Sequence, residues 1–310
     1  MAILLLACGA AACRSGEAVA SLLPARSPAE TPDRPGVLPP RGAARRIVFD
    51  MPTAAGGPRD IYLAQLDGAG LVRLTFDSVD HHTPVARGGT VYFGSTRRDG
   101  TVLAAVRLAE SDAAGWTIEP GDAPTLSPDG TMLAYLSTTG PLPRVWFSRS
   151  DGSGAQRLAA AEAGWDGAVE AHPAWSPQGD RIAYVSTRNG NAEIFVGAID
   201  GPPGSATVVA AARTGASLEP AWSPEGLRIV FSSDRDGSAD LYTVTLASGA
   251  VTRLTTMGHV GQPVWLRDDR IVFTHWQRGV AALAWLDPRH PATIHPIATA
   301  GDAQHAAAYP

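Results

Sequence analysis

The sequence has 310 residues, of which 45% are hydrophobic and 18% charged, a composition that is typical of a folded protein and excludes an intrinsically disordered chain. Its 25 basic and 30 acidic residues leave a net charge of −5, so no nucleic-acid partner is expected. Every basic residue is arginine, and the lack of lysine excludes P-loop nucleotide binding and Schiff-base chemistry.

The first 13 residues indicate an export signal. The apolar run from Ala2 to Ala12 is too short to span a bilayer but suits the core of a signal peptide. Small residues precede Cys13, which resembles a bacterial lipobox, in which the cysteine is acylated; Cys8 is the alternative. We expect a lipoprotein of the bacterial cell envelope, facing the periplasm or the surface. A cleaved soluble export signal and an alanine-rich start without a role are the other interpretations.

Residues 14–44 form the next segment, and they contain six prolines among serine, threonine, arginine and glycine. Such a density of proline favours extended polyproline conformations without an internal hydrogen-bond ladder. The composition predicts a flexible linker that holds a domain away from a membrane surface.

From residue 45 onward the sequence repeats itself. One unit reads H-P-A-W-S-P-Q-G over His172–Gly179 and R-I-A-Y-V-S over Arg181–Ser186. The next reads P-A-W-S-P-E-G over Pro220–Gly226 and R-I-V-F-S-S over Arg228–Ser233. An aromatic residue of the second segment recurs six times, at spacings of 42 to 49 residues: Phe49, Phe93, Tyr135, Tyr184, Phe231 and Phe273.

Each part of the unit has a structural interpretation. The S-P-[DEQ]-G segment suits a type I turn, with proline at its second position and glycine at its fourth, and it predicts a tight hairpin. The apolar segment that follows is typical of a strand covered on both faces, and two more short strands complete the unit. Four short strands at this period are the signature of a propeller blade. The predicted fold is an all-β, six-bladed β-propeller with four-stranded antiparallel blades.

The chain termini are expected to close the ring together. Six second strands occur, but a proline-led first strand precedes only the last five of them. The segment 303–310 falls where a sixth first strand is due, so we expect it to pair with the strand near Ile47 and remove the exposed edges. The propeller, 45–310, then divides into blades at 45–80 plus 303–310, 82–120, 122–160, 171–212, 218–257 and 261–298.

The motif P-x-W-S-P-D-G, followed by I-A-[FY]-x-S and R-x-G-x-x-x-I-Y, resembles the WD-like repeat of TolB-type propellers over residues 45–310. That resemblance implies a partner in the bacterial envelope. TolB proteins also carry an α/β domain ahead of the propeller, where this chain has its proline-rich segment. Hydrolases that use similar propellers need a G-x-S-x-G elbow, which this sequence does not contain. A similarity to oligogalacturonate lyases instead implies a metal-dependent polysaccharide lyase, with the metal held by histidine and glutamine near the ring axis.

Polar residues that vary between the units precede each inner strand, where the loops of a propeller surround the mouth of its central channel. Three imidazoles, two carboxylates and an amide suit the polar groups of a peptide or a divalent metal, and a solvated channel without a ligand explains them as well. The candidate residues are His82, Asp122, His172, Glu219, Gln262 and His305. We assign no catalytic residue, metal ligand or cofactor from the sequence.

A longer loop around Trp165 and Asp166 offers an aromatic anchor and an acidic rim for another protein, although ordinary loop variation explains it too. The function expected from these features is that of a non-catalytic, monomeric propeller that binds an envelope protein or peptide. Its contact with the membrane is expected through the lipid anchor alone.

Overall fold

The structure, a computed structural model, describes residues 46–54, 56–108, 116–161, 167–211, 214–299 and 301–309. The predicted export signal with Cys8 and Cys13, the linker, and the loop residues Trp165 and Asp166 lie outside these ranges. Within them, no helix has the length and apolar character needed to cross a membrane.

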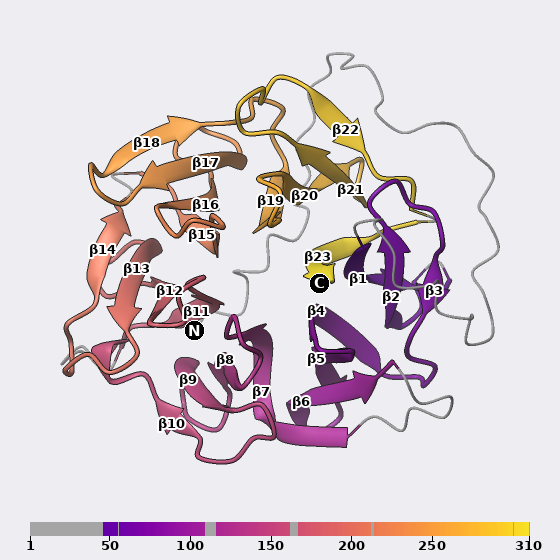
Figure 1. Cartoon of the computed structure of the whole chain (residues 1–310), viewed down its shortest axis with the longest axis horizontal. Helices are drawn as coiled ribbons and strands as arrows, with labels where there is room; N and C mark the ends of the chain where they lie inside the picture. Colours follow the sequence, from indigo (N-terminus) through magenta and orange to yellow (C-terminus); the bar gives the residue numbers. More distant parts are fainter. Residues whose placement is uncertain are drawn as a thin grey trace.

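The described chain is an all-β propeller whose antiparallel sheets surround a central axis (Figure 1). The first sheet contains β23 (Gln304–Tyr309), β1 (Arg46–Pro52), β2 (Arg59–Gln65) and β3 (Val72–Arg73), in that spatial order. Three further four-stranded sheets follow the chain order. They are β11 (Glu170–Trp175), β12 (Arg181–Ser186), β13 (Glu193–Ala198) and β14 (Thr207–Ala210); β15 (Ser217–Trp222), β16 (Arg228–Ser233), β17 (Asp240–Thr245) and β18 (Ala250–Arg253); and β19 (Val260–Trp265), β20 (Ile271–Gln277), β21 (Val280–Leu286) and β22 (Ile294–Pro296).

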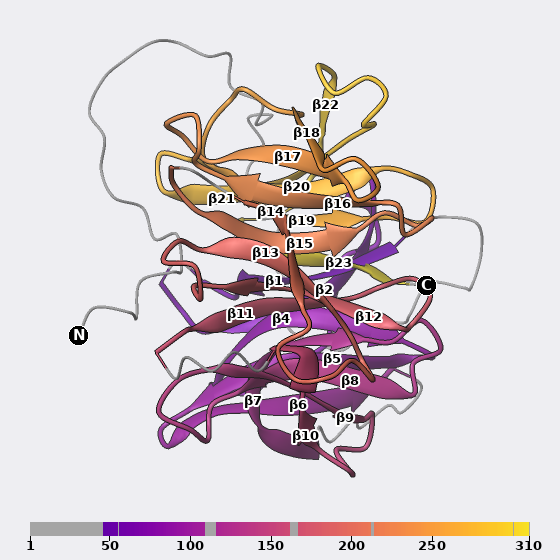
Figure 2. The same cartoon turned by 90° about the vertical axis from the view of Figure 1, so that its left-hand side faces the viewer.

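The remaining sheet has seven strands, because the long strand β7 pairs with β6 along one half and with β8 along the other. Its members are β4 (Asp80–Arg87), β5 (Thr90–Arg97), β6 (Gly100–Arg107), β7 (Trp116–Leu126), β8 (Met132–Ser137), β9 (Arg144–Arg149) and β10 (Gln156–Arg157). The first half of β7 pairs with β6, and its second half, from Gly121 to Leu126, pairs with β8. Figure 2 shows the sheets from the side of the ring, from β10 at the bottom of the view to β22 at the top.

The C-terminal strand closes the ring as the sequence predicted. β23 runs antiparallel to β1, with Ala308 opposite Ile47 and Tyr309 opposite Arg46. Ala303 and Ala306, in and just before β23, are buried in the same core cluster as the aromatic ring of Phe49. The two ends of the described chain therefore share one sheet, and β23 covers an edge of β1 that would otherwise expose unpaired backbone groups.

The hairpin turns explain why the repeated serine, proline and glycine recur. Gly179, with φ +78°, donates its backbone N–H to the carbonyl of Ser176 at 3.0 Å, which closes the turn after Pro177. The Ser176 hydroxyl also accepts a 3.0 Å hydrogen bond from the backbone N–H of Arg181. Ser223, Gly226 and Arg228 make the same contacts in the next unit, so these residues fix the start of each second strand.

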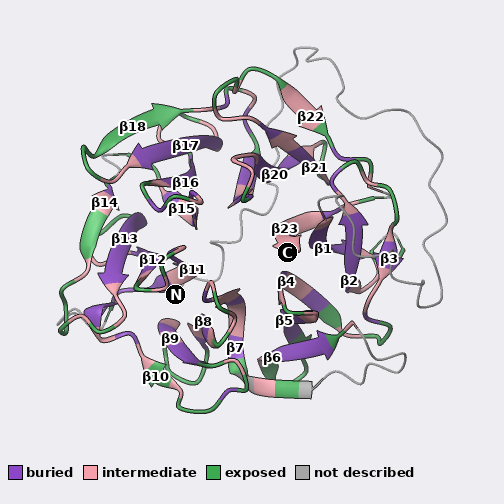
Figure 3. Ribbon diagram, in the orientation of Figure 1, coloured by how far each residue is buried: buried purple, intermediate pink, exposed green. Residues whose placement is uncertain are grey.

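The core lies between neighbouring sheets, and most of its buried residues belong to the second and third strands (Figure 3). Trp222, on β15, belongs to the same buried cluster as Val185 of the preceding sheet and Phe231 of its own, and its indole N–H donates to the carbonyl of Ala174 at 3.0 Å. The guanidinium of Arg181 lies 4.9 Å from the Trp222 ring. The recurrent tryptophan therefore joins adjacent sheets.

Candidate functional site

The six inner strands share a local irregularity. The pairing of each inner strand with its neighbour shifts register at the same point, where an extra residue forms a β-bulge. In five of the six strands, a proline follows the bulged residue. Proline has no backbone N–H, so the bulge leaves no unpaired backbone donor at that position. The bulged residues have positive φ angles between 48° and 56°: Thr83, Ala123, His172, Glu219, Gln262 and His305.

Four of the six predicted site residues therefore occupy equivalent positions in their strands. His82 and Asp122 each lie one residue ahead of that position, which Thr83 and Ala123 take in their strands. The inner strands β4, β7, β11, β15, β19 and β23 surround the middle of the ring (Figure 1). The structure thus places all six predicted residues within the inner strands, in two adjacent positions. The prediction that they precede those strands, in loops at the mouth of the channel, is wrong.

A chain of hydrogen bonds links the bulges of neighbouring sheets. The Glu219 carboxylate accepts from the backbone N–H of Gln262 at 2.6 Å and from the Ser232 hydroxyl at 2.7 Å. The side-chain oxygen of Gln262 accepts from the Thr274 hydroxyl at 2.7 Å and from the backbone N–H of His305 at 3.1 Å. Each polar side chain thus holds the backbone of the next sheet, which offsets the cost of a positive φ in a non-glycine residue.

The chain continues through the closing sheet. Nε2 of His305 lies 2.7 Å from the side-chain nitrogen of Gln262, and its Nδ1 lies 2.8 Å from Asp50 Oδ1. The same oxygen of Asp50 accepts from the backbone N–H of Thr83 at 3.3 Å. The polar belt, defined as Glu219, Gln262, His305, Asp50 and Thr83, therefore crosses four consecutive sheets.

Asp50 is the fully buried anion of this belt. Its Oδ2 pairs with Nε of Arg59 at 2.5 Å, and a second nitrogen of that guanidinium pairs with Asp302 at 3.0 Å. Burial alone favours the neutral acid, but the nearby His305 and Arg59 outweigh it and lower the pKa of Asp50 below its usual value. Burial opposes a charge on His305 as well, yet Asp50 raises the pKa of that imidazole overall.

His82 and Asp122 form a separate pair. Nδ1 of His82 lies 3.3 Å from Asp122 Oδ1, and its Nε2 lies 3.0 Å from the Thr96 hydroxyl. A Cβ atom at Gly94 would lie only 2.6 Å from both His82 and Asp122. The missing side chain at Gly94 therefore makes room for this pair.

His172 differs from the other bulged residues. Its Nδ1 is buried and makes no hydrogen bond within the described ranges. Burial lowers the pKa of His172, and the Glu219 carboxylate only partly opposes this effect. The imidazole is therefore held in its neutral form near pH 7, with one nitrogen that no described residue satisfies.

The residues that sequence reasoning missed here are Asp50 and Arg59. Asp50 lies in a second strand, at the variable position of the I-A-[FY]-x-S motif, and Arg59 belongs to no recurrent motif. A carboxylate within the apolar run of Arg46–Pro52 is the one signal that could have directed attention to them.

A pocket of about 470 Å³ lies away from the axis, beside β20, β21 and β22. Its cations are already paired, Arg270 with Asp268 at 2.9 Å and Arg289 with Asp287 at 2.8 Å. The lining residues are Asp268, Arg270, Trp285, Asp287, Arg289, His290, Thr293 and His295. These ion pairs leave little unpaired charge for a ligand, so the pocket is a weaker candidate than the axis.

Comparisons with known proteins agree with this architecture. Residues 123–295 match the profile of PD40, the TolB beta propeller domain. The chain belongs to the TolB beta propeller family. A search of curated proteins gave no match.

Similar solved structures extend the likeness of the fold to most of the chain. TolB from Acinetobacter baumannii superposes with a TM-score of 0.70 at 15% identity, covering 86% of this chain and 67% of that one. The putative TolB from Agrobacterium tumefaciens gives 0.65 at 16% identity, covering 87% and 100%. A puromycin-hydrolyzing peptidase of Mycobacterium tuberculosis gives 0.56 at 15% identity, covering 86% and 47%. At these identities the likeness concerns the fold alone.

Proposed function

We propose that this TolB-like propeller is a non-catalytic module that binds an envelope protein or peptide around its central axis, at the β-bulges of its inner strands. The observation that supports this proposal is the buried Nδ1 of His172, which no described residue satisfies. A neutral imidazole with a free nitrogen suits the N–H and C=O groups of a peptide, which need partners when they leave water. The fixed polar belt beside it gives a ligand a preorganised rim.

The architecture proposed for this function is a ring of six blades. We count the seven-stranded sheet as two blades that share β7, because β7 pairs with β6 along one half and with β8 along the other. The blades proposed from the sequence are 45–80 plus 303–310, 82–120, 122–160, 171–212, 218–257 and 261–298. Their first strands β4, β11, β15 and β19 begin one or two residues earlier than these bounds. The loop around Trp165 and Asp166 is proposed as a second contact for the partner.

We place the propeller outside the cytoplasm as a monomeric lipoprotein, with residues 1–13 as its signal, residues 14–44 as its linker, and Cys13 acylated. The sequence pattern of small residues before Cys13 supports this location. Labelling with a radioactive fatty acid tests the anchor, with Cys8→Ala as the matched control. Label retained by Cys13→Ala but lost from Cys8→Ala would contradict the assignment to Cys13.

Site-specific photo-crosslinking in the native envelope tests the binding role. A photoreactive residue at Thr83, on the axis, should capture an envelope protein, whereas the same residue at Val208, 41% exposed on β14, should not. His172→Ala should lower the yield at Thr83 about ten-fold, which corresponds to about 1.4 kcal/mol of binding free energy. Identical products from Thr83 and Val208, or a yield unaffected by His172→Ala, would contradict axial binding.

The competing hypothesis is a metal-dependent propeller enzyme such as an oligogalacturonate-lyase-like polysaccharide lyase, which requires a metal on the axis. Among the described residues, the axial histidines and carboxylates do not form a group of three with all ligand atoms within 4.8 Å. A site of three histidine or carboxylate ligands is therefore not preformed among the described axial residues, which favours the binding role.

A further inference from the structure

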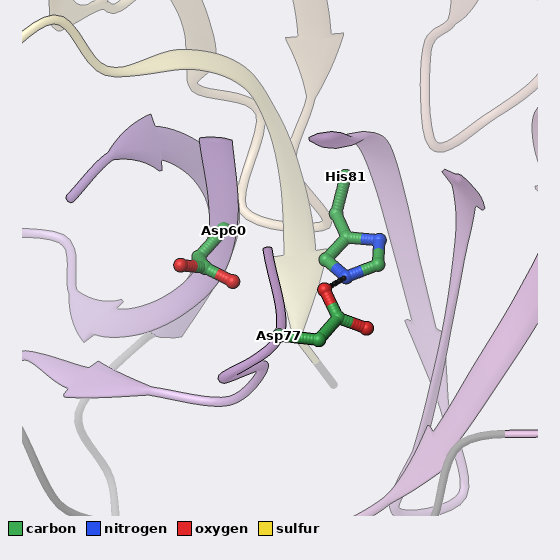
Figure 4. A group of neighbouring side chains, drawn as sticks. All are labelled: Asp60, Asp77 and His81. Carbon is green, nitrogen blue, oxygen red and sulfur yellow. Dashed lines mark hydrogen bonds and ion pairs between the residues drawn. The ribbon is translucent and has the colours of Figure 1, made fainter. Parts of the chain in front are cut away.

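One compact group of metal-binding side chains lies away from the axis, between the first sheet and β4. It consists of Asp60 at the start of β2, Asp77 in the loop after β3, and His81 on β4 (Figure 4). One ligand atom from each lies within 4.8 Å of the other two, and no other group of three in the described part of the chain meets this criterion. The group joins two neighbouring sheets beside the point where the ring closes.

His81 is rigidly held at this site. The residue is 3% exposed, its ring packs edge-on against Phe93 at 4.9 Å, and its Nε2 lies 2.8 Å from Asp77 Oδ1. Its buried Nδ1 makes no hydrogen bond with any described residue. The packing therefore presents Nε2 to the two carboxylates without any rearrangement of the ring.

Asp60 is a buried carboxylate that its neighbours only partly compensate. Its Oδ1 accepts from the Thr75 hydroxyl at 2.6 Å, and its Oδ2 pairs with the Arg73 guanidinium at 2.7 Å. Burial raises the pKa of Asp60 in spite of Thr75 and Arg73. Each carboxylate oxygen has two lone pairs, so acceptor capacity remains for a cation.

The repeat unit that contains β17 provides an internal comparison for Asp60. Asp240, at the start of β17, makes the same contacts with Arg253 and Thr255, both at 2.7 Å. Asp240 also accepts from the backbone N–H of Gly258 at 3.2 Å. The arginine and threonine contacts therefore recur between the two units, whereas the contact of Asp77 with His81 is not part of this recurrent set.

We propose that Asp60, Asp77 and His81 bind a divalent transition-metal ion, with Zn²⁺ the best fit. Zn²⁺ accepts imidazole nitrogen and carboxylate oxygen ligands and is usually four-coordinate, so one imidazole and two carboxylates leave one position for water. Ca²⁺ requires about six to eight oxygen ligands, which this group does not offer. The side chain of Asp77 is 60% exposed and gives the ion a path from solvent. The ion would tie β2 to β4 and so stabilise the contact between the first two sheets.

Titration of the metal-free full chain with Zn²⁺, followed by calorimetry and thermal unfolding, tests this site. One equivalent should bind, and a free concentration of about 100 times Kd should raise the unfolding midpoint by about 5 °C or more. Asp77→Asn keeps the oxygen that accepts from the backbone N–H of Val79 but removes the charge, so the fold should persist while Zn²⁺ affinity falls at least about ten-fold. His81→Gln should have the same effect.

Two matched variants make the result specific. Asp67→Asn alters an exposed carboxylate that makes the same local turn contact, with the backbone N–H of Ala69, and should leave affinity unchanged. His172→Ala removes the axial imidazole and should also leave it unchanged. Failure of the chain to bind Zn²⁺, or equal affinity in Asp77→Asn and wild type, would overturn the proposal. Loss of Zn²⁺ binding in His172→Ala alone would show that the ion binds at the axis and not at Asp60, Asp77 and His81, which would also overturn the proposal.

Discussion

Buried carboxylates at the start of the third strand show how single residues hold each blade. Thr255 both accepts from the backbone N–H of Leu241, at 2.9 Å, and donates to Asp240 Oδ1, at 2.7 Å. Thr75 makes the same two contacts with Ile61 and Asp60. The hydroxyl therefore satisfies one buried donor and one buried acceptor at once, which apolar side chains of equal size cannot do.

Replacing Thr255 with valine should destabilise the protein by about 2–3 kcal/mol, because it leaves a buried N–H and a carboxylate oxygen without that partner. For a domain of this size, the unfolding midpoint should fall by roughly 5–10 °C. Thr252→Val, at an exposed position of the neighbouring strand β18, is the control and should change the midpoint little. Equal midpoints for the two variants, measured by circular dichroism, would argue against this role.

At the scale of elements, the sequence predicted strands well and side-chain networks poorly. The six recurrent aromatic residues all lie in strands, because a repeated local pattern reports on turns and buried faces that each unit forms by itself. The β-bulges were not predictable, although the proline that follows His172, Glu219 and Thr83 marks their shared position in the sequence. Asp50 and Arg59 escaped prediction because their partners His305 and Asp302 lie 255 and 243 residues away in sequence.

The strand β23 makes the clearest prediction at this scale. Deletion of residues 303–310 uncovers the edge of β1 and removes Ala303 and Ala306 from the core. It also removes the His305 contact with Asp50. Together these losses should cost about 4 kcal/mol or more and lower the unfolding midpoint by about 10 °C. Removal of Pro310 alone is the control. An unchanged midpoint after the longer deletion would mean that β23 does not close the ring.

At the scale of the whole molecule, two sets of interactions act between sheets. Apolar side chains such as Trp222 fill the space between neighbouring sheets, and the polar belt joins their inner edges. The belt runs through the sheet that both ends of the described chain share, so the ring closure and the axial polar groups depend on the same residues. Asp50 is the anion on which this dependence rests, since it contacts His305, Arg59 and Thr83.

The pH dependence of the free energy of unfolding should therefore reveal the contribution of Asp50. Its folded pKa is lowered, so the stabilisation it provides is fully present above the unfolded value of 3.8 and is lost as the pH falls through the folded value. Asp50→Asn should cost about 3–5 kcal/mol near pH 7, because the partly buried guanidinium of Arg59 and imidazole of His305 lose the buried carboxylate that they contact. The difference from wild type should shrink steadily as the pH falls below about 4.

Urea unfolding at a series of pH values measures this difference. Asp302→Asn is the matched control, since Asp302 pairs with the same guanidinium but its side chain is 33% exposed. Its replacement should cost less than about 1 kcal/mol. If Asp50→Asn cost no more than Asp302→Asn near pH 7, or if its cost grew as the pH fell, Asp50 would not be the charge that holds the closing sheet to the belt.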